Sequence, residues 1–258
     1  MRSISRSGSI FGPVGDDWMT PRPVRRVVRS RDATLSGQQW PATLAPIAHV
    51  LERGLDLAQS TVVVGENGTG KSTFVEAVAT AYGLSPEGGS TGAQHSTRPT
   101  ESPLRESISL VRGPGASRWG YFLRAETMHG LFTYLEQNPS PRGEARFHEL
   151  SHGESFIAML SSNRFSGEGL FVMDEPEAGL SFTAQLALVG TLIQLVSQPG
   201  VQVLIATHSP IIASLPGATI LEFDAAGIHH RAWDDLDVVE HYRRFLQAPE
   251  RYLRHLRD

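Results

Sequence analysis

The 258-residue chain contains no cysteine. This absence excludes disulfide bonds, thiol catalysis and zinc sites built on cysteine. The sequence also lacks an uncharged apolar run of about 18 residues, the length that a membrane-spanning helix requires, and its N-terminus lacks the apolar core of a secretory signal peptide. We therefore expect a cytoplasmic protein without membrane insertion.

Lysine is almost absent as well, because Lys71 is the one lysine among 23 basic residues. A composition bias toward arginine explains the other basic positions, so the exception indicates a place that prefers a compact ammonium to a planar guanidinium. The formal net charge is −4. This balance argues against an extended polybasic surface, and any nucleic-acid contact would need a local patch.

The order of apolar segments predicts one α/β domain. Residues 1–20 are rich in serine, glycine and arginine and are expected to form a disordered tail, whereas residues 21–258 can build one core. Continuous apolar runs, typical of strands buried in a parallel sheet, alternate with helical periodicities. These runs are Thr61–Val64, Leu170–Met173 and Val201–Ala206. The alternation predicts a doubly wound, mainly parallel sheet.

Three flanking segments carry further predictions. The basic stretch Val24–Val28 is typical of a solvated edge strand rather than of a nucleic-acid patch. Helical spacing predicts one apolar helix face made by Phe182, Leu186, Val189, Leu192, Ile193 and Val196. Residues 236–257 favour an amphipathic helix docked on the domain, with a solvated basic face, over a DNA or membrane contact.

A glycine-rich segment between a predicted strand and a predicted helix matches the P-loop pattern G-x-x-x-x-G-K-[ST]. Its backbone N–H groups and the helix N-terminus would cradle phosphates. Lys71 should reach the β- and γ-phosphates, and the Ser72 hydroxyl should face Mg²⁺. The predicted nucleotide-binding residues are Gly65, Glu66, Asn67, Gly68, Thr69, Gly70, Lys71, Ser72 and Thr73.

Two adjacent acids follow the apolar run at 170–173. Asp174 is placed to organise Mg²⁺, and Glu175 could polarise an attacking water molecule. Acids at strand ends are often plain turn formers. Their position after a P-loop favours a joint phosphate and magnesium site with Ser72 and Asp174 as metal ligands.

Two more segments resemble motifs of the ABC-class ATPases. Leu150–Ser155 reads LSHGES and resembles the LSGGQ or LSGGE signature, with His152 in place of the first glycine. Ala206–Pro210 reads ATHSP and resembles the switch-histidine motif. With the P-loop and the DEPEAGL segment at 174–180, four motifs stand in the family's order across residues 61–210.

The resemblance implies a RecA-like P-loop NTPase core with a mainly parallel sheet, an N-terminal antiparallel β portion and a short helical insert at about 124–165. It further implies ATP and Mg²⁺ as cofactors and a head-to-tail homodimer with ATP at the interface. Glu175 would be the general base, His208 would hold the γ-phosphate, and the segment 178–180 would communicate between sites. The signature residues facing the partner's ATP would be Ser151, His152, Gly153 and Glu154.

The motif details resemble compact SMC-like, RecF-like and stand-alone ABC-class ATPases more than transporter subunits. The interval from Lys71 to Ser151 is too short for a long coiled-coil arm. Two alternatives stay open: the ATP-binding subunit of an ABC transporter, and an ATP-timed DNA-maintenance or regulatory module. The sequence identifies no DNA or protein partner.

Parts of the family pattern have no clear match. Transporter-type members carry a glutamine that contacts Mg²⁺ after the strand that corresponds to residues 120–123. This chain has no glutamine there, and Gln94 lies in a glycine-rich loop instead. Arg124 and Glu126 are therefore the candidate replacements. Trp40 and Trp18 are candidates for stacking on adenine, although packing roles are favoured for both.

A zinc-protease pattern, H-E-x-x-H, spans His148 to His152. Ser151 and Gly153 are poor residues for a helix interior, no third ligand is evident, and the same residues complete the signature segment. We therefore favour the ATPase interpretation of these residues over a zinc site.

Overall fold

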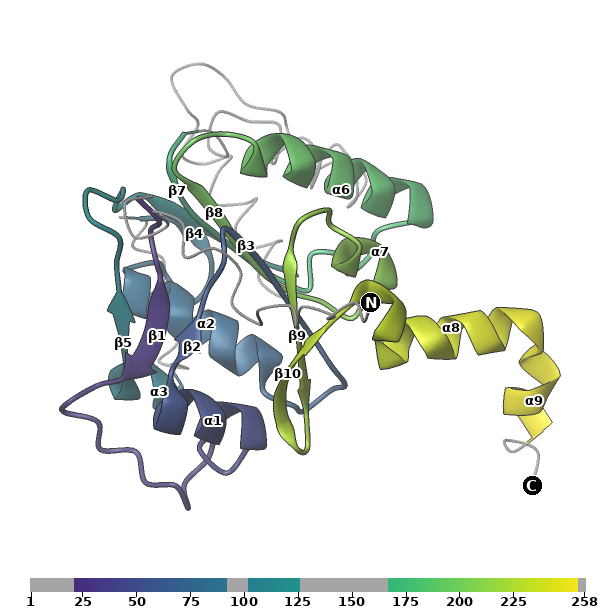
Figure 1. Ribbon diagram of the computed structural model, residues 1–258, viewed down its shortest axis with the longest axis horizontal. Helices are drawn as coiled ribbons and strands as arrows, with labels where there is room; N and C mark the ends of the chain where they lie inside the picture. Colours follow the sequence, from purple (N-terminus) through teal and green to yellow (C-terminus); the bar gives the residue numbers. More distant parts are fainter. Residues whose placement is uncertain (1–20, 92–101, 126–166, 255–258) are drawn as a thin grey trace, which may run out of the picture.

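The computed structural model describes residues 21–91, 102–125 and 167–254 (Figure 1). Its centre is a seven-stranded sheet in the order β10-β9-β3-β8-β7-β6-β4. The five inner strands run parallel and the two edge strands run antiparallel to their neighbours. The strands are β3 (Ser60–Val64), β4 (Gly89–Ser90), β6 (Gly120–Arg124), β7 (Gly169–Asp174), β8 (Val201–Ala206), β9 (Thr219–Asp224) and β10 (Gly227–Arg231). The predicted mainly parallel α/β sheet is confirmed.

The apolar runs form strands because both faces of the sheet are covered. Along β7, Phe171 and Met173 enter one hydrophobic cluster, whereas Leu170 and Val172 enter the other. Successive side chains of a strand point to opposite faces. An uninterrupted apolar run therefore fits a strand buried between two layers.

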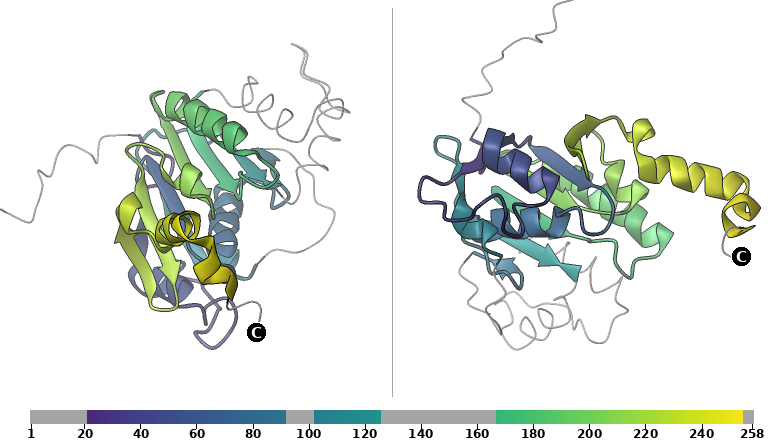
Figure 2. Two further views of the ribbon diagram at one scale, coloured as in Figure 1. Left: turned by 90° about the vertical axis from the view of Figure 1, so that its right-hand side faces the viewer. Right: turned by 90° about the horizontal axis from the view of Figure 1, so that it is seen from below.

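Helices and a second sheet build the two outer layers (Figures 1 and 2). One face carries α6 (Phe182–Val196) and α7 (Pro210–Ala213). The opposite face carries α1 (Ala45–Arg53), α2 (Lys71–Tyr82), α3 (Leu104–Ser107) and a three-stranded antiparallel sheet. That sheet contains β1 (Arg26–Arg29), β2 (Leu55–Asp56) and β5 (Ile108–Val111). The predicted N-terminal antiparallel β portion is thus present, while most of the predicted helical insert lies outside the described residues.

The prediction of an edge strand at Val24–Val28 is wrong. The strand β1 is the middle strand of its sheet, with β2 on one side and β5 on the other. Val24 is fully buried, and its backbone N–H and carbonyl both bond to the side chain of Gln202 at 2.7 Å. The arginines of β1 led to the wrong prediction, because charged side chains are typical of edge strands. The long side chain of arginine can also reach solvent from a strand that is paired on both sides.

The predicted inward face of α6 is confirmed only in part. Val189 and Leu192 are buried and Val196 packs against the core, whereas Phe182, Leu186 and Ile193 are exposed. The buried residues of α6 are Leu188, Val189, Leu192 and Leu195. The helix is apolar around most of its circumference, so periodicity alone could not select the packed face.

The C-terminal segment forms two helices, α8 (Asp237–Gln247) and α9 (Pro249–Leu253), after the 3-10 turn η5 (Trp233–Asp235). Pro249 explains the break, because proline lacks an N–H and disfavours helical backbone in the residue before it. Val239 is the one buried residue of α8, and Tyr242 and Leu246 are exposed. The helices project from the body in both figures, so the prediction of one docked helix is wrong. In the described residues, no helix combines the length and apolarity that crossing a bilayer would need.

Candidate functional site

The glycine-rich loop connects β3, which ends at Val64, to α2, which begins at Lys71. Gly65 has φ 144°, and a Cβ there would lie 2.2 Å from the backbone oxygen of Phe223. Gly70 has φ 95° and directly precedes the helix. These positions need glycine because a side chain would clash or force a left-handed backbone. The strand, loop and helix predicted from the sequence are confirmed.

Lys71 is buried at the start of α2 and is only 3% exposed. Its Nζ donates to the backbone oxygen of Glu66 at 2.9 Å, so the side chain folds back across the loop. Burial lowers the pKa of Lys71, and the nearby carboxylates of Glu175, Asp174 and Glu177 oppose that shift. The loop thus encloses a compact cation, which is the central requirement of a phosphate site.

The acidic pair stands where β7 ends. Asp174 closes the strand and is 4% exposed, and the N–H of Glu175 donates to the backbone oxygen of Ala206 at 2.9 Å. Glu175 has φ 51° and is the one non-glycine residue with positive φ in the described part of the chain. A left-handed backbone at such a residue costs on the order of 1–3 kcal/mol and is typical of functional sites.

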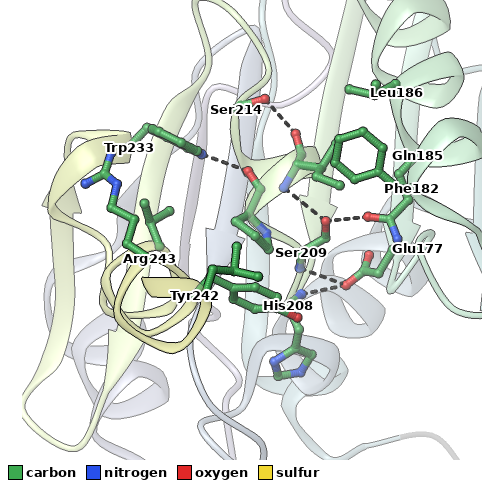
Figure 3. Close-up of a pocket in the computed structure, with 14 residues that line it drawn as sticks. Glu177, Phe182, Gln185, Leu186, His208, Ser209, Ser214, Trp233, Tyr242 and Arg243 are labelled. Carbon is green, nitrogen blue, oxygen red and sulfur yellow. Dashed lines mark hydrogen bonds between the residues drawn. The ribbon is translucent and has the colours of Figure 1, made fainter. Parts of the chain in front are cut away.

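His208 follows the end of the neighbouring strand β8. Its Nε2 lies 3.4 Å from Oε1 of Glu175. The side chains of His208 and Glu175 are 34% and 40% exposed, whereas Nε2 of His208 is itself buried. Oε1 of Glu177 accepts the backbone N–H of His208 at 2.6 Å and that of Ser209 at 3.1 Å (Figure 3). The structure therefore brings together the acid pair and the histidine that the sequence placed 33 residues apart.

Arg124 closes β6 beside Asp174, its register partner on β7. Its Nη1 lies 2.8 Å from Oε2 of Glu76, and its Nε lies 3.4 Å from Oδ2 of Asp174. Glu76 lies on α2 one helical turn after Ser72, so this ion-pair cluster adjoins the predicted magnesium site. A guanidinium has five donors and no acceptor, so Arg124 cannot replace the glutamine as a metal ligand.

Glu76 is a residue of this site that the sequence analysis missed. It is 8% exposed within α2, next to residues of the core. A carboxylate inside a buried helical stretch is a signal for an ion pair, because buried charges are almost always paired.

Several predicted residues lie outside the described ranges. These are the signature residues 151–154, the pattern at 148–152, Gln94, Glu126 and Trp18. Trp40 is described and is 57% exposed. Among the described residues, no group of three or more histidine, aspartate or glutamate side chains could hold a metal ion.

The strand, loop, buried lysine and following carboxylate define a P-loop nucleotide-binding protein. Residues 141–214 match the model of the family described as "AAA domain, putative AbiEii toxin, Type IV TA system". An uncharacterized ABC transporter ATP-binding protein of Haemophilus influenzae is 26% identical over 192 residues, which cover 66% of this chain and 72% of that protein.

Two solved structures are also similar. One is a metal-chelate type ABC transporter in an inward-facing conformation, with TM-score 0.48 and 14% identity over 88% of this chain and 89% of that one. The other is the SMC head domain from Thermotoga maritima, with TM-score 0.41 and 15% identity. The match covers 69% of this chain and 92% of that domain. Its own motifs, the family match and the sequence relative make the chain similar to ABC-class P-loop ATPases.

Replacing Lys71 with methionine should separate stability from nucleotide binding. Because the pKa of Lys71 is lowered in the folded chain, protonated Lys71 destabilises the folded state relative to the unfolded state. This destabilisation is complete at pH values below the folded-state pKa, and it disappears as the pH rises to the unfolded-state pKa. At neutral pH, Lys71→Met should therefore raise the melting temperature of the nucleotide-free protein. It should also abolish the further rise that ATP produces in the unmodified protein.

Differential scanning fluorimetry with and without ATP measures both effects. Arg53→Met is a matched control, because Arg53 is an exposed cation at the end of α1, and it should keep the ATP-induced rise. Persistence of that rise in Lys71→Met would contradict the phosphate site.

Arg124→Met should destabilise the fold, because it removes the cation between two buried carboxylates. The expected loss is about 3 kcal/mol of unfolding free energy, and a second change, Glu76→Gln, should restore part of it. Urea denaturation measures both values. Arg244→Met is the matched control, since its ion pair with Glu240 is exposed and is worth less than about 1 kcal/mol. Equal stability of the two single variants would refute the buried cluster.

Proposed function

We propose that this ATPase binds Mg-ATP at the P-loop, closes around two ATP molecules as a homodimer, hydrolyses them and reopens. The observation that carries the proposal is the convergence of three groups at the carboxyl ends of adjacent strands. Lys71 follows β3, the pair Asp174 and Glu175 follows β7, and His208 follows β8, which lies between them. A cation for phosphate, acids for metal and water, and an imidazole thus share one edge of the sheet.

Ser72 and Asp174 are the proposed magnesium ligands, together with phosphate oxygens. The donor set fits, because Mg²⁺ prefers oxygen ligands and often takes only one or two carboxylates beside the substrate's phosphates. Asp174 is nearly buried at the end of a rigid strand, so its carboxylate has a fixed position. When bound, the ion would neutralise phosphate charge and polarise the γ-phosphoryl group.

Glu175 is the proposed general base. It would accept a proton from a water molecule whose oxygen attacks the γ-phosphorus, while the bond from that phosphorus to the bridging oxygen breaks and ADP leaves. His208, 3.4 Å from this carboxylate, would orient the γ-phosphate and the water. Lys71 would balance negative charge on the phosphates throughout, which is the main catalytic contribution in phosphoryl transfer.

A second copy is proposed to complete the site. The side chains of Glu175 and His208 are partly exposed, and the turn at Ala178 and Gly179 beside them is exposed, so a second chain could contact this side of the site. In the proposed dimer, that side receives the partner's signature segment. The contributing residues would be Ser151, His152, Gly153 and Glu154. ATP then favours the closed dimer through its higher affinity for that state.

The process served by hydrolysis has two candidate settings. The name of the Haemophilus influenzae relative favours a transporter's ATP-binding subunit. The motif details of the segments at 174–181 and 207–210 favour a stand-alone SMC-like ATPase that acts with DNA or a protein partner, and the short interval between the P-loop and the signature segment leaves no room for a long coiled-coil arm. Recovery with a membrane protein would support the first setting, and stimulation of ATPase activity by DNA, lost at raised salt, would support the second.

Glu175→Gln should trap the closed dimer. The amide keeps the shape of the side chain but cannot accept the proton, so hydrolysis should fall by at least about 100-fold while ATP binding persists. Size-exclusion chromatography with light scattering, in ATP and Mg²⁺, should show a stable dimer that is absent without nucleotide.

The control is Glu168→Gln, which changes an exposed glutamate before the start of the same strand and should behave as the unmodified protein. A Glu175→Gln variant that binds ATP and stays monomeric at all concentrations would overturn the dimer.

A further inference from the structure

Glu177 makes two backbone contacts that none of the predicted roles explains. Its Oε1 accepts the N–H of His208 at 2.6 Å and the N–H of Ser209 at 3.1 Å. Both donors belong to the turn that follows β8, which ends at Ala206, and the N–H of Ser209 also donates to Oγ1 of Thr207 at 2.9 Å. Buried backbone N–H groups require acceptors, and a charged acceptor makes the stronger bonds.

A second set of bonds ties the same turn to Gln185, which lies on the same side of it as Glu177 (Figure 3). The Ser209 hydroxyl donates to Oε1 of Gln185 at 2.6 Å, and Nε2 of Gln185 donates to the backbone oxygen of Leu180 at 3.1 Å. Ser209 is 7% exposed and Thr207 is fully buried. The turn that carries His208 is therefore fastened to the segment from Glu177 to Gln185.

His208 depends on this fastening for its position. Its side chain is 34% exposed, and its Nε2 lies 3.4 Å from the carboxylate of Glu175. Although the side chain is partly exposed, its Nε2 is buried against the site, so a shift of the backbone would move this nitrogen relative to Glu175. Glu177 is two residues from Glu175 in the same turn, so one short segment sets the distance between the base and the histidine.

We propose that Glu177 is a positioning residue for ATP hydrolysis, which acts by holding the backbone of His208 at its working distance from Glu175. The inference rests on the proposed function. Glu177 transfers no proton and contacts no phosphate in this role. Ala178 and Gly179 follow Glu177 directly and are exposed. A second chain that contacts this turn would therefore move the carboxylate of Glu177 and, through its hydrogen bond, the backbone of His208.

Two substitutions separate the hydrogen bonds from the charge. Glu177→Gln keeps an amide oxygen with two lone pairs, which can accept both N–H groups, whereas Glu177→Ala removes the acceptor. Glu177→Ala should lower kcat by about 10- to 100-fold, the scale expected for misplacing a catalytic group by about 1 Å, and leave KM for ATP within about twofold. Glu177→Gln should stay within about threefold of the unmodified protein in kcat.

A double-mutant cycle tests whether Glu177 acts through His208. In a His208→Ala background, adding Glu177→Ala should cause no further loss of kcat, because the group being positioned is already gone. Ser181→Ala is the control for a general structural effect, since Ser181 caps α6 through Ala184 and is not bonded to the His208 turn. It should lower stability and leave kcat unchanged.

Amide hydrogen exchange provides a measurement that does not depend on turnover. In the nucleotide-free protein, Glu177→Ala should accelerate exchange at His208, and Glu177→Gln should not. Exchange at Ser209 should change less, because its N–H also donates to Oγ1 of Thr207 at 2.9 Å. Unchanged exchange in Glu177→Ala, independent losses in the double-mutant cycle, or a Glu177→Gln variant as impaired as Glu177→Ala would each overturn the proposal. Failure of the unmodified protein to hydrolyse ATP would instead overturn the proposed function, and the exchange result would still decide the positioning role.

Discussion

The charge of Lys71, held out of water at the start of α2, is the constraint around which the site is arranged. An ammonium in that position is unfavourable alone, and its lowered pKa expresses that cost. The surrounding carboxylates of Glu175, Asp174 and Glu177 offset part of it. Phosphate groups would supply further negative charge beside this cation, so the charge of Lys71 favours an anionic ligand at the loop.

The same logic explains why this chain keeps one lysine among its many arginines. At the other described basic positions, a guanidinium can extend to solvent or form a forked ion pair, as Arg124 does between Glu76 and Asp174. Inside the P-loop the cation is enclosed by backbone and reaches back to the oxygen of Glu66. A compact ammonium with rotatable donors fits that space, and a wide planar group does not.

Sequence patterns predicted the parts of the molecule in which local and tertiary signals agree. The run at 201–206 is apolar, bounded by turns and buried on both faces, so β8 has the predicted limits. The P-loop was recognisable because its glycines are required locally, as the close approach of Gly65 to Phe223 shows. Where several faces of an element are apolar, as on α6, the sequence does not say which one packs, and Phe182 and Leu186 are exposed against expectation.

Contacts between distant segments were the least predictable part of the site. Nothing in the residues next to Glu177 indicates that its carboxylate bonds to the backbone of His208, or that Arg124 joins Glu76 to Asp174. These pairings depend on strand order, which places β7 between β6 and β8. Motifs therefore identified the candidate residues of the nucleotide site, and the fold was needed to identify the side chains that bond to them.

The most direct test of the account is the rate of phosphate release from ATP by the unmodified protein, measured over a range of protein concentrations with and without Mg²⁺. An ATPase that works as a dimer should require the metal, and its rate per chain should rise with protein concentration until dimerisation is complete. Absence of phosphate release at every concentration, or release that continues without Mg²⁺, would contradict the account.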